Sequence, residues 1–205
     1  FMTVCSISRN EAGRRVGAVL VGKPDPATQT SAGNSKHKVT DPDVNEVGAA
    51  LDLLQLAHDE IVKRIQTHFA GHALARLVDA VLRADGWITK LSPPGADGGV
   101  DILAGRGPLG LDAPRLCIQV KSQGSAADVN VYRTLQSAMT TFSADQGLLI
   151  CWGGFNRALR AEARQSHFSV RLWEDRDLVE AIYRNYERLP AEIQTELPLK
   201  KVWML

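Results

Sequence analysis

Short apolar runs alternate with amphipathic segments from residue 87 onward, and this alternation limits the possible folds more than any other feature. The runs typical of strands are WITKL, VDILA, RLCIQVK, GLLICW and SVRLW, and a segment with helical spacing follows each of the last three. Alternating strands and helices build sheets that carry helices on their faces. The sequence therefore predicts an α/β fold with a three-layer core. The turn SPPGADGG and the connection GRGPLGLDAP predict that VDILA and RLCIQVK form an antiparallel hairpin.

The first 86 residues divide into segments of different character. We interpret residues 1–22, which include the weak strand pattern RVGAVLVG, as the remnant of a preceding domain. Residues 23–43 are rich in Pro, Ser, Thr, Asn and Asp, which is typical of a linker. Residues 44–205 form one domain that begins with a helix up to His68, and a second helix follows between Leu74 and Leu82. Gly86 lies where that second helix is expected to end.

Composition excludes several classes of protein. The 205 residues carry 24 basic and 23 acidic side chains, so the net charge of +1 lacks the basic excess of many nucleic-acid-binding domains. No apolar run approaches the roughly 20 residues that cross a bilayer, and no signal peptide is recognisable, so we expect a cytoplasmic protein. Cys5, Cys117 and Cys151 show no CxxC spacing, which favours buried thiols over disulfides or zinc sites.

Three polar residues interrupt the apolar strands of the predicted hairpin. Asp101 lies in the first strand, and Gln119 and Lys121 share one face of the second because side chains alternate along a strand. Such groups suit phosphodiester hydrolysis, in which the carboxylate and the amide oxygen hold a divalent cation and the ammonium assists the attacking water. They also suit ordinary strand ends with solvated or backbone-bonded side chains, and the spacing by itself favours that simpler interpretation.

Longer motifs around these residues resemble a known family. SPPGADGGVDILA followed by LCIQVKSQ is similar to the Mrr-like branch of the PD-(D/E)xK nucleases, the restriction-endonuclease-like fold of type IV restriction enzymes, where a GxDGGxD segment precedes a QxK strand. The similarity continues through GLLICWGGFNRALRAEA and VRLWEDRDLVEAI to LPLKKVW, and so spans about residues 53–203. The resemblance implies a restriction-endonuclease-like core with a mixed central sheet flanked by helices. It also implies a Mg²⁺-dependent DNA endonuclease, with Mn²⁺ as a substitute ion, that acts in restriction or defence against foreign or modified DNA.

The resemblance assigns roles to individual residues. Asp101 matches the metal-binding aspartate of the family, Gln119 the position filled by Glu, Asp or Gln, and Lys121 the catalytic lysine. The backbone carbonyl ligand falls on Val120. A neutral amide at Gln119 gives the metal one formal negative charge less than a carboxylate does, so phosphate oxygens of DNA would contribute to its binding.

One position departs from the family pattern. Many Mrr-like proteins carry a glutamate in the first core helix, where this chain has Ala75. Asp79 on the same helical face, or His72 just before the helix, could take its place. The simpler interpretation is that Asp79 is a solvated helix residue and that His72 caps the helix or packs against it.

The implied partner is double-stranded DNA, together with a second copy in a homodimer and an N-terminal recognition domain outside this chain. Two other functions stay open: a catalytically inactive DNA-binding or interaction domain, which Ala75 favours, and a junction-resolving or repair nuclease. Because the domain is nearly neutral, any positive cleft must come from the arrangement of its cations. The candidates are Arg83, Lys90, Arg106, Arg115 and Arg133.

Overall fold

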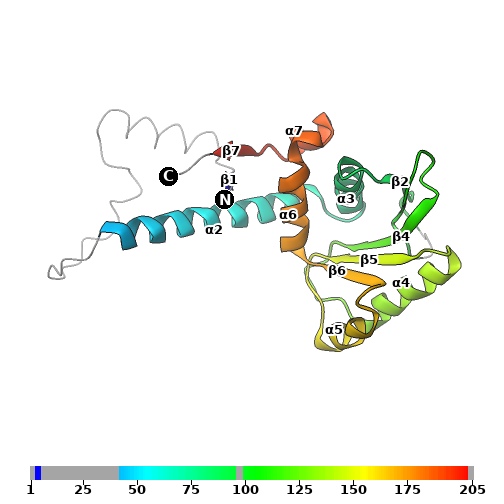
Figure 1. The fold of residues 1–205 in the computed structure, drawn as a ribbon. Coiled ribbons are helices and arrows are strands. Elements are labelled where there is room, and N and C mark those ends of the chain that lie inside the picture. The colour runs from blue at the N-terminus through cyan, green and yellow to red at the C-terminus, as the bar shows by residue number, and fades with distance from the viewer. Residues whose placement is uncertain (1–2, 6–41, 96–98, 203–205) are drawn as a thin grey trace. The chain divides into compact units, whose positions relative to one another are not determined.

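The structure is a computed structural model that describes residues 3–5, 42–95 and 99–202. It divides into two compact units, of which the second runs from Val62 to Pro198 (Figure 1). The first unit includes the described residues up to Ile61 and those from Leu199 onward. The segment RVGAVLVG and the predicted linker up to residue 41 lie outside the described residues.

The first unit contains a strand pair that the sequence did not predict. Strand β1 (Thr3–Cys5) pairs antiparallel with β7 (Lys200–Val202), and Thr3 lies opposite Val202. Three-residue strands are too short to show a period of two. Helix α2 (Pro42–His68) begins in this unit and ends in the second, which confirms the helix predicted up to His68.

A five-stranded mixed sheet forms the centre of the second unit. Its order is β2-β3-β4-β5-β6, with antiparallel pairing from β2 to β4 and parallel pairing from β4 to β6. The predicted hairpin of β3 and β4 is therefore confirmed. The bounds are Ile88–Leu91 for β2, Ile102–Arg106 for β3, Asp112–Lys121 for β4, Gln146–Cys151 for β5 and Val170–Trp173 for β6.

Helices cover both faces of this sheet and complete the predicted three layers. Figure 1 shows α4 and α5 on one side of the sheet and α3 and α6 on the other. Helices α4 and α5 connect the parallel strands, as the alternation in the sequence predicted. The short helix α7 was not predicted. The bounds are His72–Ala84 for α3, Val129–Thr141 for α4, Arg157–Ala163 for α5, Asp175–Asn185 for α6 and Ala191–Glu196 for α7.

Local sequence explains where these helices begin. The side chain of Asp128 accepts hydrogen bonds from the backbone N–H groups of Asn130 and Val131 and so starts α4. Glu174 and Asp177 form a capping box at the start of α6, where an Asp-rich helix start was expected. No helix in the described part of the chain is long and apolar enough to cross a membrane.

The core between the sheet and the helices α4 and α5 is apolar. Tyr132 and Leu135 of α4 and Leu159 of α5 are fully buried together with Cys117 of β4 and Leu149 of β5. Successive side chains of a strand point to opposite faces, so β4 presents Cys117 to this core and carries Gln119 and Lys121 on the same face. The two predicted site residues therefore lie where the apolar part of this face ends.

Candidate active site

Asp101 lies immediately before β3 and is held against β4 by hydrogen bonds. Its backbone N–H donates to the carbonyl oxygen of Ile118 at 2.9 Å. Its Oδ2 atom accepts from the backbone N–H of Val120 at 2.7 Å. The sequence placed Asp101 inside the strand, whereas β3 begins one residue later. The N–H of Val120 thus donates to a carboxylate and not to a main-chain carbonyl oxygen. This side-chain hydrogen bond takes the place of regular strand pairing at Asp101.

Asp101, Val120 and Lys121 line one cavity of about 220 Å³. The half-buried Lys121 ends β4, and Asp101 precedes β3, so the antiparallel pairing brings both to the same end of the sheet. The remaining lining comes from the start of α3, the turn after β2 and the end of β4: Gly71, His72, Ala75, Pro93, Pro94, Gly95, Ser122 and Gln123. The structure thus brings together three of the four residues that the resemblance placed in the site.

Gln119, the fourth residue, precedes Val120 in β4 and is not part of the cavity lining. Its side chain is only 4% exposed, and its Oε1 atom has no hydrogen-bond partner among the described residues. A buried amide oxygen without a donor is costly, and a hard cation would satisfy it. This oxygen, the Asp101 carboxylate and the Val120 carbonyl are the donor types that Mg²⁺ prefers, so these residues fit the metal that the resemblance implies.

Gly99 allows the chain to pass close to Gln119. Its φ of +86° lies in the left-handed region, and a Cβ atom there would come within 2.6 Å of Thr134 Cγ2 and 3.8 Å of Gln119 Nε2. Glycine is therefore required at this position by its backbone conformation and by the space around it. Asp97, considered from the sequence as a second metal ligand or a turn residue, lies outside the described residues.

A metal here would depend on more than acidic side chains. Within residues 55–95 and 99–201, whose side chains are described, no group of three or more His, Cys, Asp or Glu residues is placed to hold a metal ion. Among these residues, a site at Asp101 would combine its carboxylate with neutral oxygen or nitrogen donors. This agrees with the amide and carbonyl ligands that the resemblance assigned to Gln119 and Val120.

The position of Ala75 agrees with its alignment to the missing glutamate, because Ala75 lines the same cavity as Asp101. Asp79 does not line it. The prediction of a solvated Asp79 is wrong: its side chain is 12% exposed, pairs with Arg83 at 2.9 Å and accepts from Thr89 Oγ1 at 2.5 Å. This carboxylate links α3 to β2 and takes no part in the cavity.

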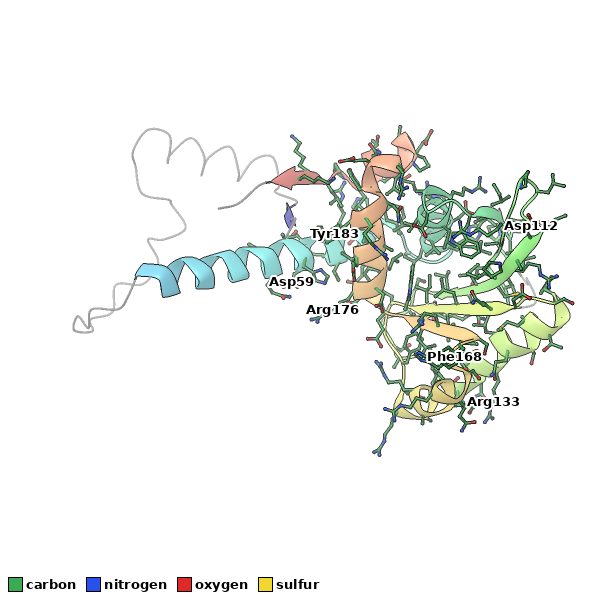
Figure 2. The ribbon with its side chains drawn as sticks, in the orientation of Figure 1. Asp59, Asp112, Arg133, Phe168, Arg176 and Tyr183 are labelled. Atoms are coloured by element: carbon green, nitrogen blue, oxygen red, sulfur yellow. The ribbon has the colours of Figure 1, made fainter. Side chains whose placement is uncertain are left out.

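Most of the cations proposed for a positive cleft have partners within the domain. The Arg106 guanidinium lies 3.8 Å above the Trp87 ring. Arg133 projects from α4 (Figure 2) and pairs with Glu162 at 3.0 Å. Arg83 pairs with Asp79 and Arg115 with Asp145, whereas no ion pair is found for Lys90 among the described residues. Lys121 is therefore the clearest positive charge at the cavity.

The structure also tests the weaker sequence signals. His68 ends α2 and His72 begins α3, so the two histidines do not share a helix face. Trp152, which follows β5, is 7% exposed and therefore packs in the core. Cys117 and Cys151 are buried free thiols, as predicted, and burial raises the pKa of Cys117 to about 11.

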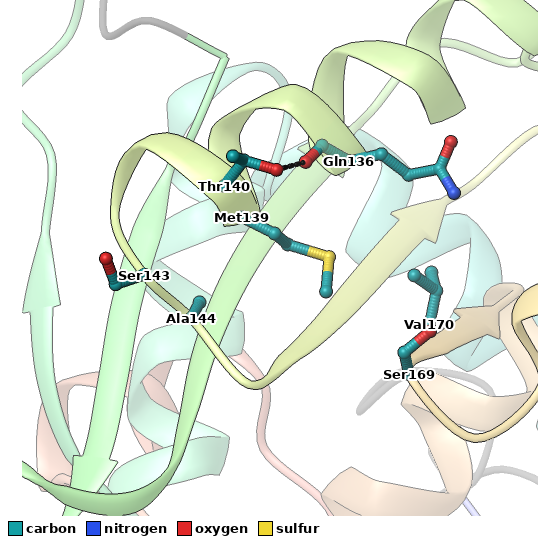
Figure 3. A pocket seen from close by; sticks show the side chains of 7 residues that line it. All are labelled: Gln136, Met139, Thr140, Ser143, Ala144, Ser169 and Val170. Carbon is teal, nitrogen blue, oxygen red and sulfur yellow. Dashed lines mark hydrogen bonds between the residues drawn. The ribbon is translucent and has the colours of Figure 1, made fainter.

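A larger cavity of about 450 Å³ lies at the opposite end of the sheet (Figure 3). It lies beside the amino ends of β5 and β6, whereas Lys121 marks the carboxyl end of the neighbouring β4. None of its lining residues is titratable, so it offers no carboxylate, imidazole or ammonium for acid–base chemistry. The lining consists of Gln136, Met139, Thr140, Ser143, Ala144, Ser169 and Val170.

Comparison with known families agrees with the geometry of the smaller cavity. A family model described as restriction endonuclease (Mrr_cat) matches residues 67–182, more than half of the chain, and this segment includes Asp101, Gln119 and Lys121. The chain belongs to the restriction endonuclease family. The matched segment also includes Ala75, which the resemblance aligns with a helix glutamate of many Mrr-like proteins. No curated protein is similar enough in sequence to count as a match.

The chain is also similar to solved structures. The DNA modification-dependent restriction endonuclease AspBHI is 16% identical, with a TM-score of 0.50 over 94% of this chain and 49% of AspBHI. The MspJI restriction endonuclease, solved in complex with a 27-mer oligonucleotide, is 19% identical, with a TM-score of 0.43 over 82% of this chain and 39% of MspJI. The chain thus spans about half the length of AspBHI, and that likeness confirms the restriction-endonuclease-like fold.

Proposed function

We propose that this domain is a Mg²⁺-dependent endonuclease that hydrolyses phosphodiester bonds of double-stranded DNA, with restriction of foreign or modified DNA as its role. The observations that support this most are the gathering of Asp101, Val120 and Lys121 around one cavity and the buried Oε1 atom of Gln119, which has no hydrogen-bond partner among the described residues. Membership in the restriction endonuclease family makes DNA the expected substrate.

The residues of the cavity divide the chemistry between them. Asp101, Gln119 Oε1 and the Val120 carbonyl would hold the Mg²⁺ ion, which when bound supplies positive charge at the phosphate and acidifies a water molecule. Lys121 places its ammonium beside the same cavity, where it orients the attacking water. Water attacks phosphorus as the bond to the leaving oxygen breaks, and the Lys121 charge offsets the negative charge that develops on the phosphate oxygens.

Recognition of the DNA is proposed to reside outside this domain. The relative AspBHI is described as modification-dependent, and this chain spans about half of its length. We therefore extend the proposal to an N-terminal recognition domain and to a homodimer, in which two active sites cut the two strands. A second function is favoured by Ala75: a methyl group at the cavity, in place of a carboxylate, would suit a domain that binds DNA without cutting it.

Plasmid cleavage tests the proposal. Methylated and unmethylated supercoiled plasmid is incubated with the wild type, Asp101→Ala or Lys121→Ala in Mg²⁺, Mn²⁺ or EDTA. We expect metal-dependent nicking by the wild type that both substitutions abolish. Lys63→Ala, which removes an exposed lysine of α2 away from the cavity lining, is the matched control and should cut normally.

The other outcomes are equally informative. If the wild type binds DNA and never cuts with either metal, the non-catalytic function is correct. Cutting that survives Asp101→Ala would place the chemistry elsewhere in the molecule. Thermal melts of each variant show whether a loss of activity follows from unfolding.

A further inference from the structure

We propose that His72 is a protein ligand of the active-site metal and takes the place of the carboxylate that is missing at Ala75. The inference rests on the proposed metal site of Asp101 and Gln119. His72 is the first residue of α3, and Ala75 follows three positions later. Residues three apart on a helix lie on the same face, and both of these line the cavity that also contains Asp101.

The hydrogen bond of His72 decides which ring nitrogen can bind a metal. His72 Nε2 lies 2.8 Å from the carbonyl oxygen of Ser92. A carbonyl can only accept, so Nε2 carries the proton and the neutral ring keeps its lone pair on Nδ1. Metal-binding histidines have this arrangement, in which a backbone carbonyl or carboxylate fixes the ring through its second nitrogen.

Ser92 also bonds the backbone of Asp101, so one residue orients the His72 ring and fixes the main chain that carries the carboxylate. Its backbone N–H donates to the carbonyl oxygen of Asp101 at 2.8 Å. Its hydroxyl donates to the carbonyl oxygen of Val100, also at 2.8 Å. The turn after β2 therefore ties the start of α3 to the strand that carries the carboxylate. Hydrogen bonds of this kind, from residues behind the ligands, hold the ligands of a metal site in position.

A second contact fixes the start of α3 against the other side of the cavity. The backbone N–H of Gly71 donates to Ser122 Oγ at 3.0 Å. Ser122 follows Lys121 at the end of β4, so His72 is held next to the strand that carries Gln119 and Val120. The donor set would then be one carboxylate, neutral oxygens and one imidazole.

An imidazole ligand changes which metal the site prefers. Mg²⁺ favours oxygen ligands, whereas imidazole suits first-row transition metals, whose affinity for such sites rises from Mn²⁺ toward Cu²⁺. We therefore expect this domain to bind Mn²⁺ more tightly than Mg²⁺, and His72 to be responsible for the difference.

Electron paramagnetic resonance with Mn²⁺ alone tests this without any cleavage reaction. The full chain is titrated with Mn²⁺ to obtain its affinity, and electron spin-echo modulation of the bound ion reports a coordinated nitrogen. We expect ¹⁴N modulation in the wild type. In His72→Gln it should disappear, and the Mn²⁺ affinity should fall about 10- to 100-fold, at least the loss seen when a supporting partner is removed. Gln retains an N–H that can donate to Ser92, so the variant protects the fold.

Two further variants complete the test. His68→Ala removes the exposed histidine at the end of α2 and should leave both the affinity and the ¹⁴N modulation unchanged. Adding Ala75→Glu to His72→Gln should restore Mn²⁺ binding without the ¹⁴N modulation and should shift the preference toward Mg²⁺. A thermal melt of each variant verifies that it is folded.

The results separate this inference from the proposed function. Wild-type Mn²⁺ binding that shows no ¹⁴N modulation, is unchanged in His72→Gln and is lost in Asp101→Asn would overturn the role of His72 and keep the metal site. Mn²⁺ binding that is unaffected by Asp101→Asn would overturn the site itself, and the proposed function with it.

Discussion

The Oδ2 atom of Asp101 accepts a 2.7 Å hydrogen bond from the backbone N–H of Val120, so the proposed carboxylate ligand is bonded to the residue that offers the proposed carbonyl ligand. The carboxylate thus has two functions. It joins the start of β3 to the end of β4, and it supplies the negative charge of the cavity. Substitutions can separate these two contributions.

Asp101→Asn and Asp101→Ala should lose activity equally and differ in stability. Each removes the carboxylate charge, so DNA cleavage should fall by at least about 100-fold. Asparagine can still accept from Val120, whereas alanine leaves that N–H unpartnered at a cost of about 1–3 kcal/mol. Cleavage rates and urea unfolding measure the two effects. Equal unfolding free energies of the two variants would show that the hydrogen bond does not contribute to stability.

The Gln119→Glu variant should be less stable than the wild type without metal, and bound metal should restore its stability. The side chain is 4% exposed, and its Oε1 atom lacks a partner, so a carboxylate there would be buried and its pKa raised. We expect an unfolding free energy lower by about 1–3 kcal/mol in EDTA, with recovery in Mn²⁺. Urea unfolding in both conditions measures this. If Mn²⁺ leaves the difference in unfolding free energy between wild type and variant unchanged, Gln119 is remote from the metal.

Asp79→Ala should lower stability and keep activity, whereas Asp101→Asn should keep stability and lose activity. Asp79 accepts from Thr89 Oγ1 at 2.5 Å and pairs with Arg83 at 2.9 Å, away from the cavity. Its removal should lower the free energy of unfolding by about 1–3 kcal/mol and leave metal affinity and cleavage unchanged. Calorimetry and plasmid assays on the same preparation provide the comparison. Loss of Mn²⁺ affinity in a folded Asp79→Ala would mean that this carboxylate reaches the metal.

The ion pair of Arg115 and Asp145 should make stability depend on pH in the acid range. Hydrogen bonds from the Arg115 guanidinium and backbone N–H lower the pKa of Asp145 below its ordinary value of 3.8. The carboxylate is ionised in the folded protein at pH values where the unfolded chain already binds a proton. Its stabilising contribution is therefore complete above about pH 4 and is lost as the pH falls through the folded pKa.

Urea unfolding of the wild type and of Asp145→Asn between about pH 2.5 and 6 measures this contribution. The variant should lose less stability on acidification than the wild type does. Arg115→Gln should show an intermediate slope, because its backbone N–H still donates to Asp145 at 2.8 Å. Identical slopes in all three proteins would assign the acid sensitivity to other carboxylates.

Sequence patterns predicted the architecture of the second unit well, because strand and helix periods are local properties of the chain. The antiparallel hairpin of β3 and β4 was predicted from the turn between two apolar runs, and the start of α6 from its acidic residues. The same patterns did not predict the pairing of β1 with β7, since residues 3 and 202 meet only in the folded chain. Nor did they predict the short helix α7.

The sequence by itself determined which residues are proposed to carry the chemistry: Asp101, Gln119 and Lys121 with their spacing, and Ala75 where a carboxylate is missing. Only the tertiary structure decided where the neighbouring polar groups lie. It buried Asp79 against Arg83 and Thr89, and it turned His72 toward Ser92 at the cavity. The reason is physical. Backbone periodicity is written into neighbouring residues, whereas burial and hydrogen-bond partners depend on contacts between distant parts of the chain.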